Sequence, residues 1–282
     1  MIRPPRSILF ATDFSGRCDR PLDRALRLAG LWQAKLILLH VIEAARADLP
    51  EAERRAEEAR AAARLRAEAG DSPVEIEVRI VEGPVAATIA EVAESAEADL
   101  IVTGVARYNR LGDFVLGTTV DRLLRRSHTP ILVVKERARS DYRSILVATD
   151  FSDCSATALE TAAGFFPTAS LALAHAYRVP LEPLLGRETG APALQAKIAL
   201  QLDEFVEQLH LPPEIRDGIA FHIDYGETEP VLSYLAGEMA ADLAVIGAHG
   251  RSGFTAATIG STAKALLEAL TCDVLLVRDE PP

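Results

Sequence analysis

The sequence contains two copies of one pattern. The segment SILFATDFS at 7–15 recurs as SILVATDFS at 144–152, an offset of 137 residues. A second segment, DLIVTG at 99–104, recurs as DLAVIG at 242–247, an offset of 143 residues. A repeat of this length has the size of one ordinary domain, so it predicts two similar domains in tandem. The larger second offset predicts an insertion in the second copy, between its second and third strands.

The boundary between the copies falls in the charged stretch ERARSDY at 136–142, which lacks apolar periodicity. We therefore expect one domain at 1–139 and another at 140–282. In both copies, short runs rich in Leu, Ile and Val alternate with longer helical patterns, which is typical of βαβ units around a parallel sheet. The predicted fold class is α/β, with two tandem Rossmann-like, open, parallel five-stranded sheets and helices on both faces.

Each copy is predicted to contain five strands and four helices. In the first copy the strands are expected near 7–13, 35–41, 74–81, 99–103 and 130–135, and the helices near 19–33, 48–69, 84–97 and 117–126. In the second copy the strands are expected near 143–149, 170–176, 219–225, 242–247 and 273–278, and the helices near 155–166, 189–210, 229–240 and 260–270. In such a sheet a ligand binds beyond the carboxyl ends of the strands, where the strand order reverses.

Charge and composition narrow the classes of function. The formal net charge is −11, and no Lys/Arg stripe offsets it, so we expect neither nucleic acid nor an anionic membrane as a partner. No apolar run reaches the ~18 residues of a membrane span, and residues 1–6 lack a signal-peptide pattern, so a cytoplasmic protein is expected. Cys18, Cys154 and Cys272 are scattered and form no CxxC pair, which predicts thiols that are inert or merely oxidisable, without a disulfide framework or a zinc site.

A glycine-rich loop follows the fourth strand of the second copy. Its spacing is G-x2-G-x9-G-S, with glycines at 247, 250 and 260, followed by Ser261 and Thr262 at a predicted helix N-terminus. Glycines allow backbone N–H groups to approach an anion closely, and a helix N-terminus attracts negative charge. The loop therefore predicts a phosphate site without a Walker lysine, because no GxxxxGK[ST] motif is present. The alternative is that the glycines only allow the chain to turn.

A carboxylate ends the first strand of each copy, at Asp13 and Asp150. The first and fourth strands are expected side by side, so Asp150 is predicted near Gly247, where it can accept hydrogen bonds from a ribose or an adenine amino group. The alternative role is a helix N-cap. Ser15 and Ser152 fit the cap better, which would leave both aspartates free for a ligand.

The motif ATDFS followed by G-x2-G-x9-G-S resembles the pattern of the universal stress protein family, and the whole chain resembles its tandem two-domain form. The resemblance implies the adenine nucleotide alpha hydrolase-like version of the fold and an ATP site, expected with Mg²⁺, in the second copy. The candidate binding residues are Ala148, Thr149, Asp150, Ala176, Gly247, His249, Gly250, Arg251, Gly260, Ser261 and Thr262. Ala148 and Ala176 are expected to line the adenine slot. His249 and Arg251 are expected either to touch phosphate or to be exposed.

The first copy departs from the pattern at one position. Arg107 stands where the second glycine is expected, between Gly104 and Gly117. Its side chain is expected to obstruct the close approach of a phosphate. Alternatively, its guanidinium makes a bidentate phosphate contact, and the first copy binds nucleotide in an altered pose.

His40 and His175 lie at the ends of the second strands and could join Asp13, or Asp150 and His249, in a metal site, but no ligand-spaced pair accompanies them. We predict no metal site and interpret both histidines as hydrogen-bonded structural residues. The fifth strands are apolar and are expected at sheet edges that need cover. In the family these strands pair between domains, which implies a pseudo-twofold dimer within the chain and leaves a homodimer open.

Three functions remain open. The first is a regulatory adenine-nucleotide sensor in a stress response, with a protein partner that the sequence does not identify. The second is a slow ATPase, or a protein that phosphorylates itself on a loop serine such as Ser261. The third is a scaffold or a protein that binds another small ligand. Since neither copy resembles a nucleophile with its base or a paired-carboxylate centre, no catalytic residue is predicted.

Overall fold

The computed structural model describes residues 2–43, 50–105, 107–108, 114–115, 118–178, 187–250 and 259–279, and it describes the side chains of all of these except 107–108, 114–115, 118 and 187–193. The chain forms two compact units. The N-terminal unit holds the described residues from Pro4 to Asp141, with Ile259. The C-terminal unit holds Ile2, Arg3 and the described residues 142–250 and 260–279.

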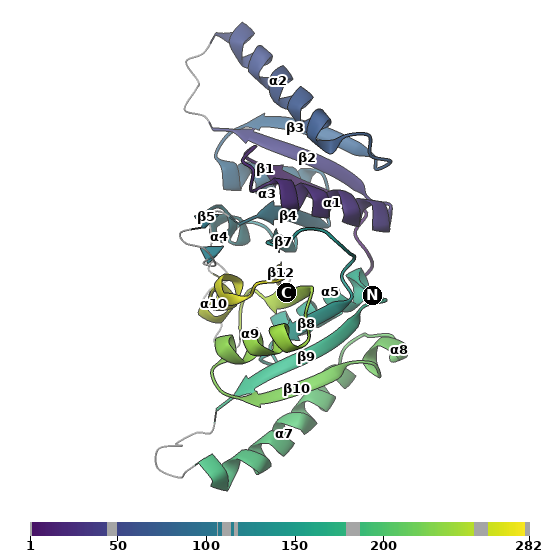
Figure 1. Ribbon diagram of the computed structural model, residues 1–282, viewed down its shortest axis with the longest axis vertical. Helices are drawn as coiled ribbons and strands as arrows, with labels where there is room; N and C mark the ends of the chain where they lie inside the picture. The colour runs from purple at the N-terminus through teal and green to yellow at the C-terminus, as the bar shows by residue number, and fades with distance from the viewer. Residues whose placement is uncertain are drawn as a thin grey trace. The chain divides into compact units, whose positions relative to one another are not determined.

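The N-terminal unit is built on a parallel sheet with the strand order β3-β2-β1-β4-β7 (Figure 1). Its strands are β1 (Ser7–Thr12), β2 (Lys35–Ile42), β3 (Ile76–Glu82), β4 (Leu100–Gly104) and β7 (Ile131–Val134). Its helices are α1 (Asp19–Trp32), α2 (Glu51–Ala69), α3 (Val85–Ser95) and α4 (Thr118–Leu124). A separate antiparallel pair joins β5 (Arg107–Tyr108) to β6 (Phe114–Val115).

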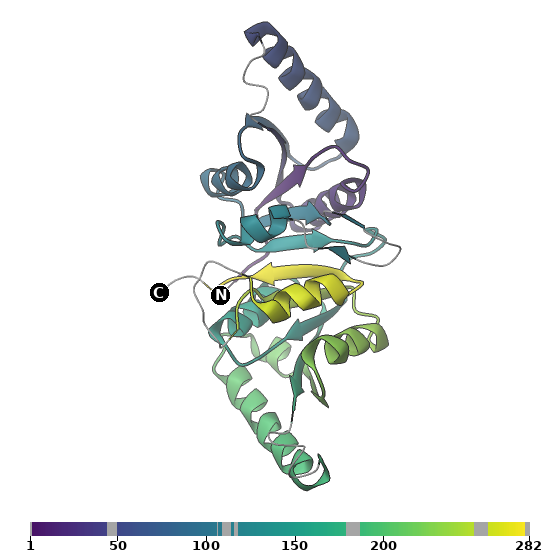
Figure 2. The same ribbon diagram turned by 90° about the vertical axis from the view of Figure 1, so that its left-hand side faces the viewer.

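The C-terminal unit repeats this arrangement, with the parallel strand order β10-β9-β8-β11-β12. Its strands are β8 (Ser144–Ala148), β9 (Ser170–Tyr177), β10 (Ala220–Tyr225), β11 (Leu243–Gly247) and β12 (Asp273–Val277). Its helices are α5 (Asp153–Phe165), α7 (Arg187–Glu207), α8 (Pro213–Arg216), α9 (Thr228–Glu238) and α10 (Ser261–Ala269). Figure 2 shows α10, in yellow, lying along β12, and α9 and α10 contact each other.

These two sheets confirm the predicted fold class and all the predicted strands and helices, with bounds that shift by a few residues. Two features were not predicted. The short α8 lies between β9 and β10, where the second copy has its insertion, and it begins at the pair Pro212–Pro213. The β5–β6 pair lies in the first-copy segment where the sequence predicted only a loop.

The cores follow from the apolar strands. Every residue of β7 and of β12 is buried, and in β1 only Ser7 is partly exposed. By contrast, α2 buries only Ala61, Leu65 and Ala69, and the charged residues of this helix stay on its solvent side.

The third strand of each unit ends at a glycine that the repeat aligns. Gly83 has φ +155° and Gly226 has φ +149°, a backbone region that residues with a Cβ rarely adopt. A Cβ at Gly226 would stand 2.8 Å from Cγ2 of Val231, in the helix that follows. These glycines therefore set the sharp turn from strand to helix in both copies. Within the described residues, no helix combines the length and the apolar character that crossing a membrane requires.

Candidate functional site

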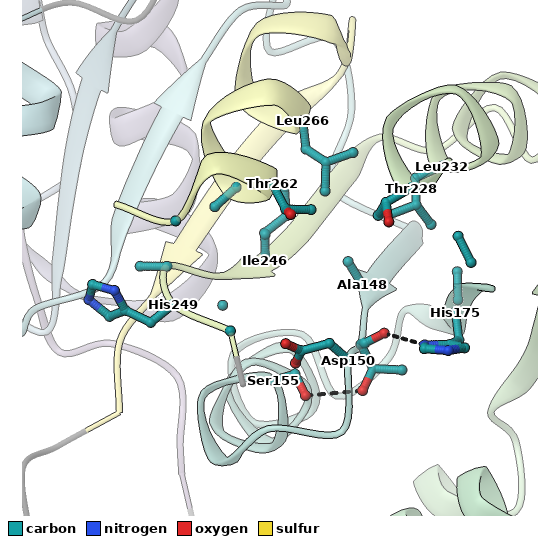
Figure 3. A pocket seen from close by; sticks show the side chains of 18 of the residues that line it. Ala148, Asp150, Ser155, His175, Thr228, Leu232, Ile246, His249, Thr262 and Leu266 are labelled. Carbon is teal, nitrogen blue, oxygen red and sulfur yellow. Dashed lines mark hydrogen bonds between the residues drawn. The ribbon is translucent and has the colours of Figure 1, made fainter. Parts of the chain in front are cut away.

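A pocket of about 450 Å³ opens at the carboxyl ends of β8 and β11 in the C-terminal unit (Figure 3). These two strands are neighbours. In the sheet, β9 and β10 lie on one side of β8, and β11 and β12 lie on the other side. The pocket is therefore at the point where the strand order reverses. The pocket is lined by Ala148, Thr149, Asp150, Ser155, Ala174, His175, Ala176, Thr228, Leu232, Ile246, Gly247, Ala248, His249, Gly250, Gly260, Ser261, Thr262, Ala263 and Leu266.

The structure brings ten of the eleven candidate residues together in this pocket. They are Ala148, Thr149, Asp150, Ala176, Gly247, His249, Gly250, Gly260, Ser261 and Thr262. The remaining candidate, Arg251, lies outside the described residues. Figure 3 shows the ring of His249 pointing away from Ala148 and Asp150. His249 thus borders the pocket without pointing its imidazole ring into it.

Asp150 is held in a turn by the serine two residues later. Its Oδ1 atom accepts hydrogen bonds from the Ser152 backbone N–H at 3.1 Å and from the Ser152 hydroxyl at 2.5 Å. The Oδ2 atom lies on the side of Gly250, 2.6 Å from the position of a Cβ built on that glycine. The sequence suggested that Asp150 is free for a ligand. In the structure it is only partly free, because its Oδ1 atom organises the turn.

The N-cap prediction is confirmed in one copy and wrong in the other. Ser152 caps α5, where its side chain accepts a hydrogen bond from the Ser155 N–H. In the first copy, α1 begins later, with Cys18 at the N-cap position and no side-chain cap. The Ser15 hydroxyl instead accepts a hydrogen bond from Arg17 Nε at 3.3 Å. Because α1 begins after Cys18, Ser15 is not at the N-cap position of that helix.

The residue that follows the aspartate adopts a left-handed backbone in both copies. Phe14 has φ 60° and Phe151 has φ 62°, a conformation that is unfavourable for a bulky side chain. Aromatic packing holds each turn: the Phe151 ring lies 4.6 Å from the His175 ring and 5.8 Å from the Phe205 ring. Surrounding contacts thus stabilise the strained turn that carries Asp150.

His175 has a structural role at this turn. Its Nδ1 atom donates a hydrogen bond to the Thr149 carbonyl at 2.8 Å (Figure 3). In the first copy, His40 donates the equivalent bond to the Thr12 carbonyl at 2.9 Å. This agrees with the interpretation of both histidines as hydrogen-bonded residues. Across the part of the chain that the structure describes, no three His, Cys, Asp or Glu side chains are grouped to hold a metal ion.

The glycines of the loop meet different neighbours. A Cβ at Gly247 would stand 3.1 Å from the Cys154 sulfur, so this glycine lets β11 pack against α5. The Gly260 N–H is donated to the Ala248 carbonyl at 2.8 Å, and it stabilises the loop itself. Gly260 is also the N-cap of α10, and no side chain in the described ranges caps that helix. The donors that α10 can offer an anion are therefore the first-turn N–H groups, beginning at Ser261 and Thr262.

Sequence reasoning missed part of the pocket wall. Ser155 lines the pocket from α5, and its Oγ lies 3.0 Å from Oγ1 of Thr149. Thr228 and Leu232 line it from α9, and both are labelled in Figure 3. The glycines that end the third strands could have pointed to this part of the wall. Thr228 follows Gly226 by two residues and begins the next helix, at the same end of the sheet as the pocket.

In the N-terminal unit, the carboxylate that corresponds to Asp150 is Asp13, and it has different neighbours. Asp13 lies 3.6 Å from the guanidinium of Arg17 and accepts a hydrogen bond from the Cys18 thiol at 3.2 Å. Partial burial acts to raise the pKa of Asp13, but hydrogen bonds from Ser15 and Cys18, with the charge of Arg17, hold the pKa below its usual value. Arg17 and Cys18 stand where the repeat places Cys154 and Ser155. The first copy therefore puts a cation of its own beside the carboxylate.

The position of Arg107 bears on the first-copy loop. The backbone of Arg107 lies in β5 and pairs with Val115 of β6. The chain thus forms an antiparallel pair where the second copy has its second glycine. The side chain of Arg107 and the whole of Gly117 lie outside what the structure describes, so obstruction of a phosphate by Arg107 stays a prediction.

The comparison with known proteins finds the same family in both copies of the repeat. The sequence profile of the Universal stress protein family matches residues 5–135 and again residues 141–278. A universal stress protein of Mycolicibacterium smegmatis is 28% identical over 301 residues, covering 96% of this chain and 96% of that protein. Universal stress protein E of Photorhabdus laumondii is 27% identical over 232 residues, covering 74% of this chain and 71% of that protein.

A solved structure shows the same fold. The crystal structure of a universal stress protein from Archaeoglobus fulgidus superposes with a TM-score of 0.72, covering 97% of this chain and 98% of that chain, at 17% identity. At this identity the likeness supports the architecture alone.

Proposed function

Because the chain belongs to the universal stress protein family, we propose that its C-terminal unit binds an adenine nucleotide, ATP with Mg²⁺, and that the protein acts as a nucleotide-dependent regulator rather than a fast enzyme. The observation that carries the proposal is the convergence of Asp150, the glycine loop and the uncapped start of α10 on one pocket. These groups lie far apart in the sequence and come from different elements.

The lining of the pocket divides into two kinds of surface. Ala148, Ala174, Ala176 and Leu232 give an apolar wall that suits a planar base. Asp150 provides a carboxylate that can accept hydrogen bonds from ribose hydroxyls or from a base amino group. The volume of about 450 Å³ is within the range of small-ligand sites.

The phosphates are assigned to the other end of the pocket. There the first-turn N–H groups of α10 and the hydroxyls of Ser261 and Thr262 line the wall. Backbone donors at a helix N-terminus hold phosphate without a lysine. Carboxylate and hydroxyl oxygens are the ligand types that Mg²⁺ takes in proteins, and Asp150, Ser155 and Thr262 supply both types in the pocket. When bound, the ion would neutralise phosphate charge.

A regulator needs two states that differ in affinity for the ligand. We assign this role to Gly250 and the start of α10, which border the pocket. Nucleotide contacts there would favour one of two states of the C-terminal unit, and an unidentified protein partner would read the resulting surface. Domains 1–139 and 140–282 are proposed as the functional divisions of the chain, with nucleotide bound in the second.

Calorimetric titration tests the proposal. We expect saturable binding of ATP, weaker binding of inorganic pyrophosphate, and loss of ATP binding in Asp150→Ala. The matched control is Asp13→Ala, which removes the equivalent carboxylate from the first copy and should leave ATP binding intact. Absence of saturable ATP binding by the wild-type protein, or equal loss in both variants, would contradict the proposal.

A further inference from the structure

Three hydroxyl side chains of the C-terminal unit surround the turn that carries Asp150. Thr149 is 7% exposed and Ser155 is 3% exposed, and both line the pocket. Ser152 is the N-cap of α5, and Ser155 is the third residue of that helix. Because these hydroxyls are largely shielded from water, their protons are donated to acceptors within the protein.

The hydrogen bonds of these hydroxyls run in one direction. The Ser155 hydroxyl donates to the Ser152 carbonyl at 2.9 Å. A hydroxyl has one proton to donate, so in the contact of 3.0 Å between Thr149 Oγ1 and Ser155 Oγ the proton comes from Thr149 (Figure 3). Thr149 Oγ1 in turn accepts the Phe151 N–H at 3.0 Å. We name Thr149, Ser155 and Ser152 the hydroxyl relay.

The hydroxyl relay ends at the carboxylate. The Ser152 hydroxyl donates to Asp150 Oδ1 and accepts the Ser155 N–H at 3.2 Å. The relay thus binds the turn on both sides of Phe151, whose left-handed backbone needs surrounding contacts to persist. While Oδ1 of Asp150 is held from within the turn, Oδ2 lies on the side of Gly250. The relay therefore sets which oxygen of the carboxylate is presented to a ligand.

In the N-terminal unit a cysteine replaces the central member of the relay. The outer members are the same residue types in both copies, and Ser155 aligns with Cys18 at the offset of 137 residues. The Cys18 N–H is donated to the Ser15 carbonyl at 2.9 Å, and the Cys18 thiol donates to Asp13 Oδ1 at 3.2 Å. Burial raises the pKa of the Cys18 thiol, which keeps the proton on sulfur. At this position, serine donates to the backbone of the turn, whereas cysteine donates to the carboxylate itself.

This exchange changes what holds the turn. A thiol is a weak donor and its sulfur is a weak acceptor, so a cysteine at position 155 would bind the Ser152 carbonyl and the Thr149 hydroxyl less firmly than the serine does. It would also bring a competing donor to the carboxylate, as Cys18 does at Asp13. Both effects would disturb the orientation of Asp150.

We propose that Ser155 is a positioning residue of the nucleotide site, which orients the Asp150 carboxylate through the hydroxyl relay, and that cysteine at this position contributes to the predicted loss of binding in the first copy. The inference rests on the proposed function of the C-terminal unit. The role is separate from any contact of Ser155 with Mg²⁺, because Ser155 acts here through Thr149 and Ser152.

Ser155→Cys and Ser155→Ala test the relay, with Thr157→Ala as the matched control. Thr157 also lies in α5, and its hydroxyl donates to the Asp153 carbonyl at 3.0 Å. It is not among the described residues that line the pocket. Each change thus removes or weakens a bond from a side chain to a backbone carbonyl, and only two of them affect the relay. Calorimetric titration uses ATP and inorganic pyrophosphate, each with Mg²⁺ and with a chelator.

We expect ATP binding to weaken about tenfold in Ser155→Cys and less in Ser155→Ala, because only the thiol adds a competing donor for Asp150. The ratio to the wild type should be the same with Mg²⁺ and with the chelator. Pyrophosphate binding should be unchanged in both variants, which would show that the pocket is folded, and Thr157→Ala should bind both ligands like the wild type. Equal losses for ATP and pyrophosphate, a loss confined to Mg²⁺, or weaker binding in Ser155→Ala than in Ser155→Cys would overturn the positioning role.

Amide hydrogen exchange in the nucleotide-free protein gives a readout that does not depend on ATP. The N–H groups of Phe151 and Ser152 are bonded to Thr149 Oγ1 and Asp150 Oδ1. Both should exchange faster in Ser155→Ala and at the wild-type rate in Thr157→Ala. Unchanged exchange in Ser155→Ala would overturn the relay. If the wild type binds ATP and Ser155→Cys binds it equally well, the positioning role is wrong and the proposed function stands, whereas a wild type that binds no ATP overturns both.

Discussion

The Oδ2 atom of Asp150 lies 2.6 Å from the point where a Cβ on Gly250 would stand. The second glycine of the loop therefore faces the carboxylate at the end of the first strand. Its lack of a side chain leaves room for that carboxylate, besides any room it leaves for a ligand. This contact couples two parts of the motif that the sequence separates by 100 positions.

We predict that Gly250→Ala weakens ATP binding at least about tenfold, equivalent to about 1.4 kcal/mol. The added methyl group would displace Asp150 and strain its hydrogen bonds to Ser152. The dissociation constant, measured by calorimetric titration, checks this. The control is Gly237→Ala, where a Cβ would meet nothing within 4 Å, and it should bind like the wild type.

A double-mutant cycle separates the clash from other effects of Gly250→Ala. In the background of Asp150→Ala the methyl group meets no carboxylate, so Gly250→Ala should change the free energy of unfolding much less there than in the wild type. Equal changes in the two backgrounds would show that the contact with Asp150 is not the cause.

The two copies should differ in stoichiometry. We predict one ATP bound per chain, because Arg107 replaces the second glycine and Arg17 pairs with Asp13 in the first copy. Gly250→Arg should abolish binding, and the combined change of Arg107→Gly and Arg17→Cys should introduce a second, weaker site. Titration gives these numbers directly. Two equivalent sites in the wild type would contradict the assignment.

The carboxyl group of Asp13 should titrate below its usual value of 3.8. Since the folded-state pKa is lowered, the ionised group stabilises the fold above the unfolded value, and this contribution is lost as the pH falls through the folded pKa. The side chain is 64% exposed, so solvent screening keeps the effect on stability small.

Carboxyl NMR titration measures this pKa directly. Among the groups that lower it, the Ser15 hydroxyl acts more strongly than the charge of Arg17. Ser15→Ala should therefore raise the pKa of Asp13 more than Arg17→Gln does. The reverse order would show that the ion pair dominates.

Gly226→Ala should lower the free energy of unfolding by about 1–3 kcal/mol. The new side chain would have to adopt φ +149° and would collide with Val231. Chemical denaturation measures the loss, and Gly237→Ala again provides a glycine in open space for comparison. A stability equal to that of the control would mean that the turn after β10 relaxes without cost.

Much of the fold and of the site could be predicted because the sequence repeats its signals. Apolar runs that recur in both copies identified the strands, and the rule for open parallel sheets placed Asp150 and Gly247 at neighbouring strand ends. Ten candidate residues consequently line one pocket. The binding of ATP there remains a proposal that the titrations test.

The features that were missed depend on tertiary contacts. Ser15 carries the right chemistry for a cap, but α1 begins later, with Cys18 at the N-cap position. Thr228 was not predicted to line the pocket. The sequence shows that it begins a helix near a strand end, but it does not show which residues there face a cavity.

The left-handed turn at Phe151 has a consequence for ligand binding. A backbone in this region costs about 1–2 kcal/mol for a residue with a side chain, and packing against His175 and Phe205 sustains it without help from a ligand. The free-energy cost of orienting the Asp150 carboxylate is thus met when the protein folds. A nucleotide would meet an acceptor that is already pre-organised, and little of its binding free energy would be spent on ordering that side of the pocket.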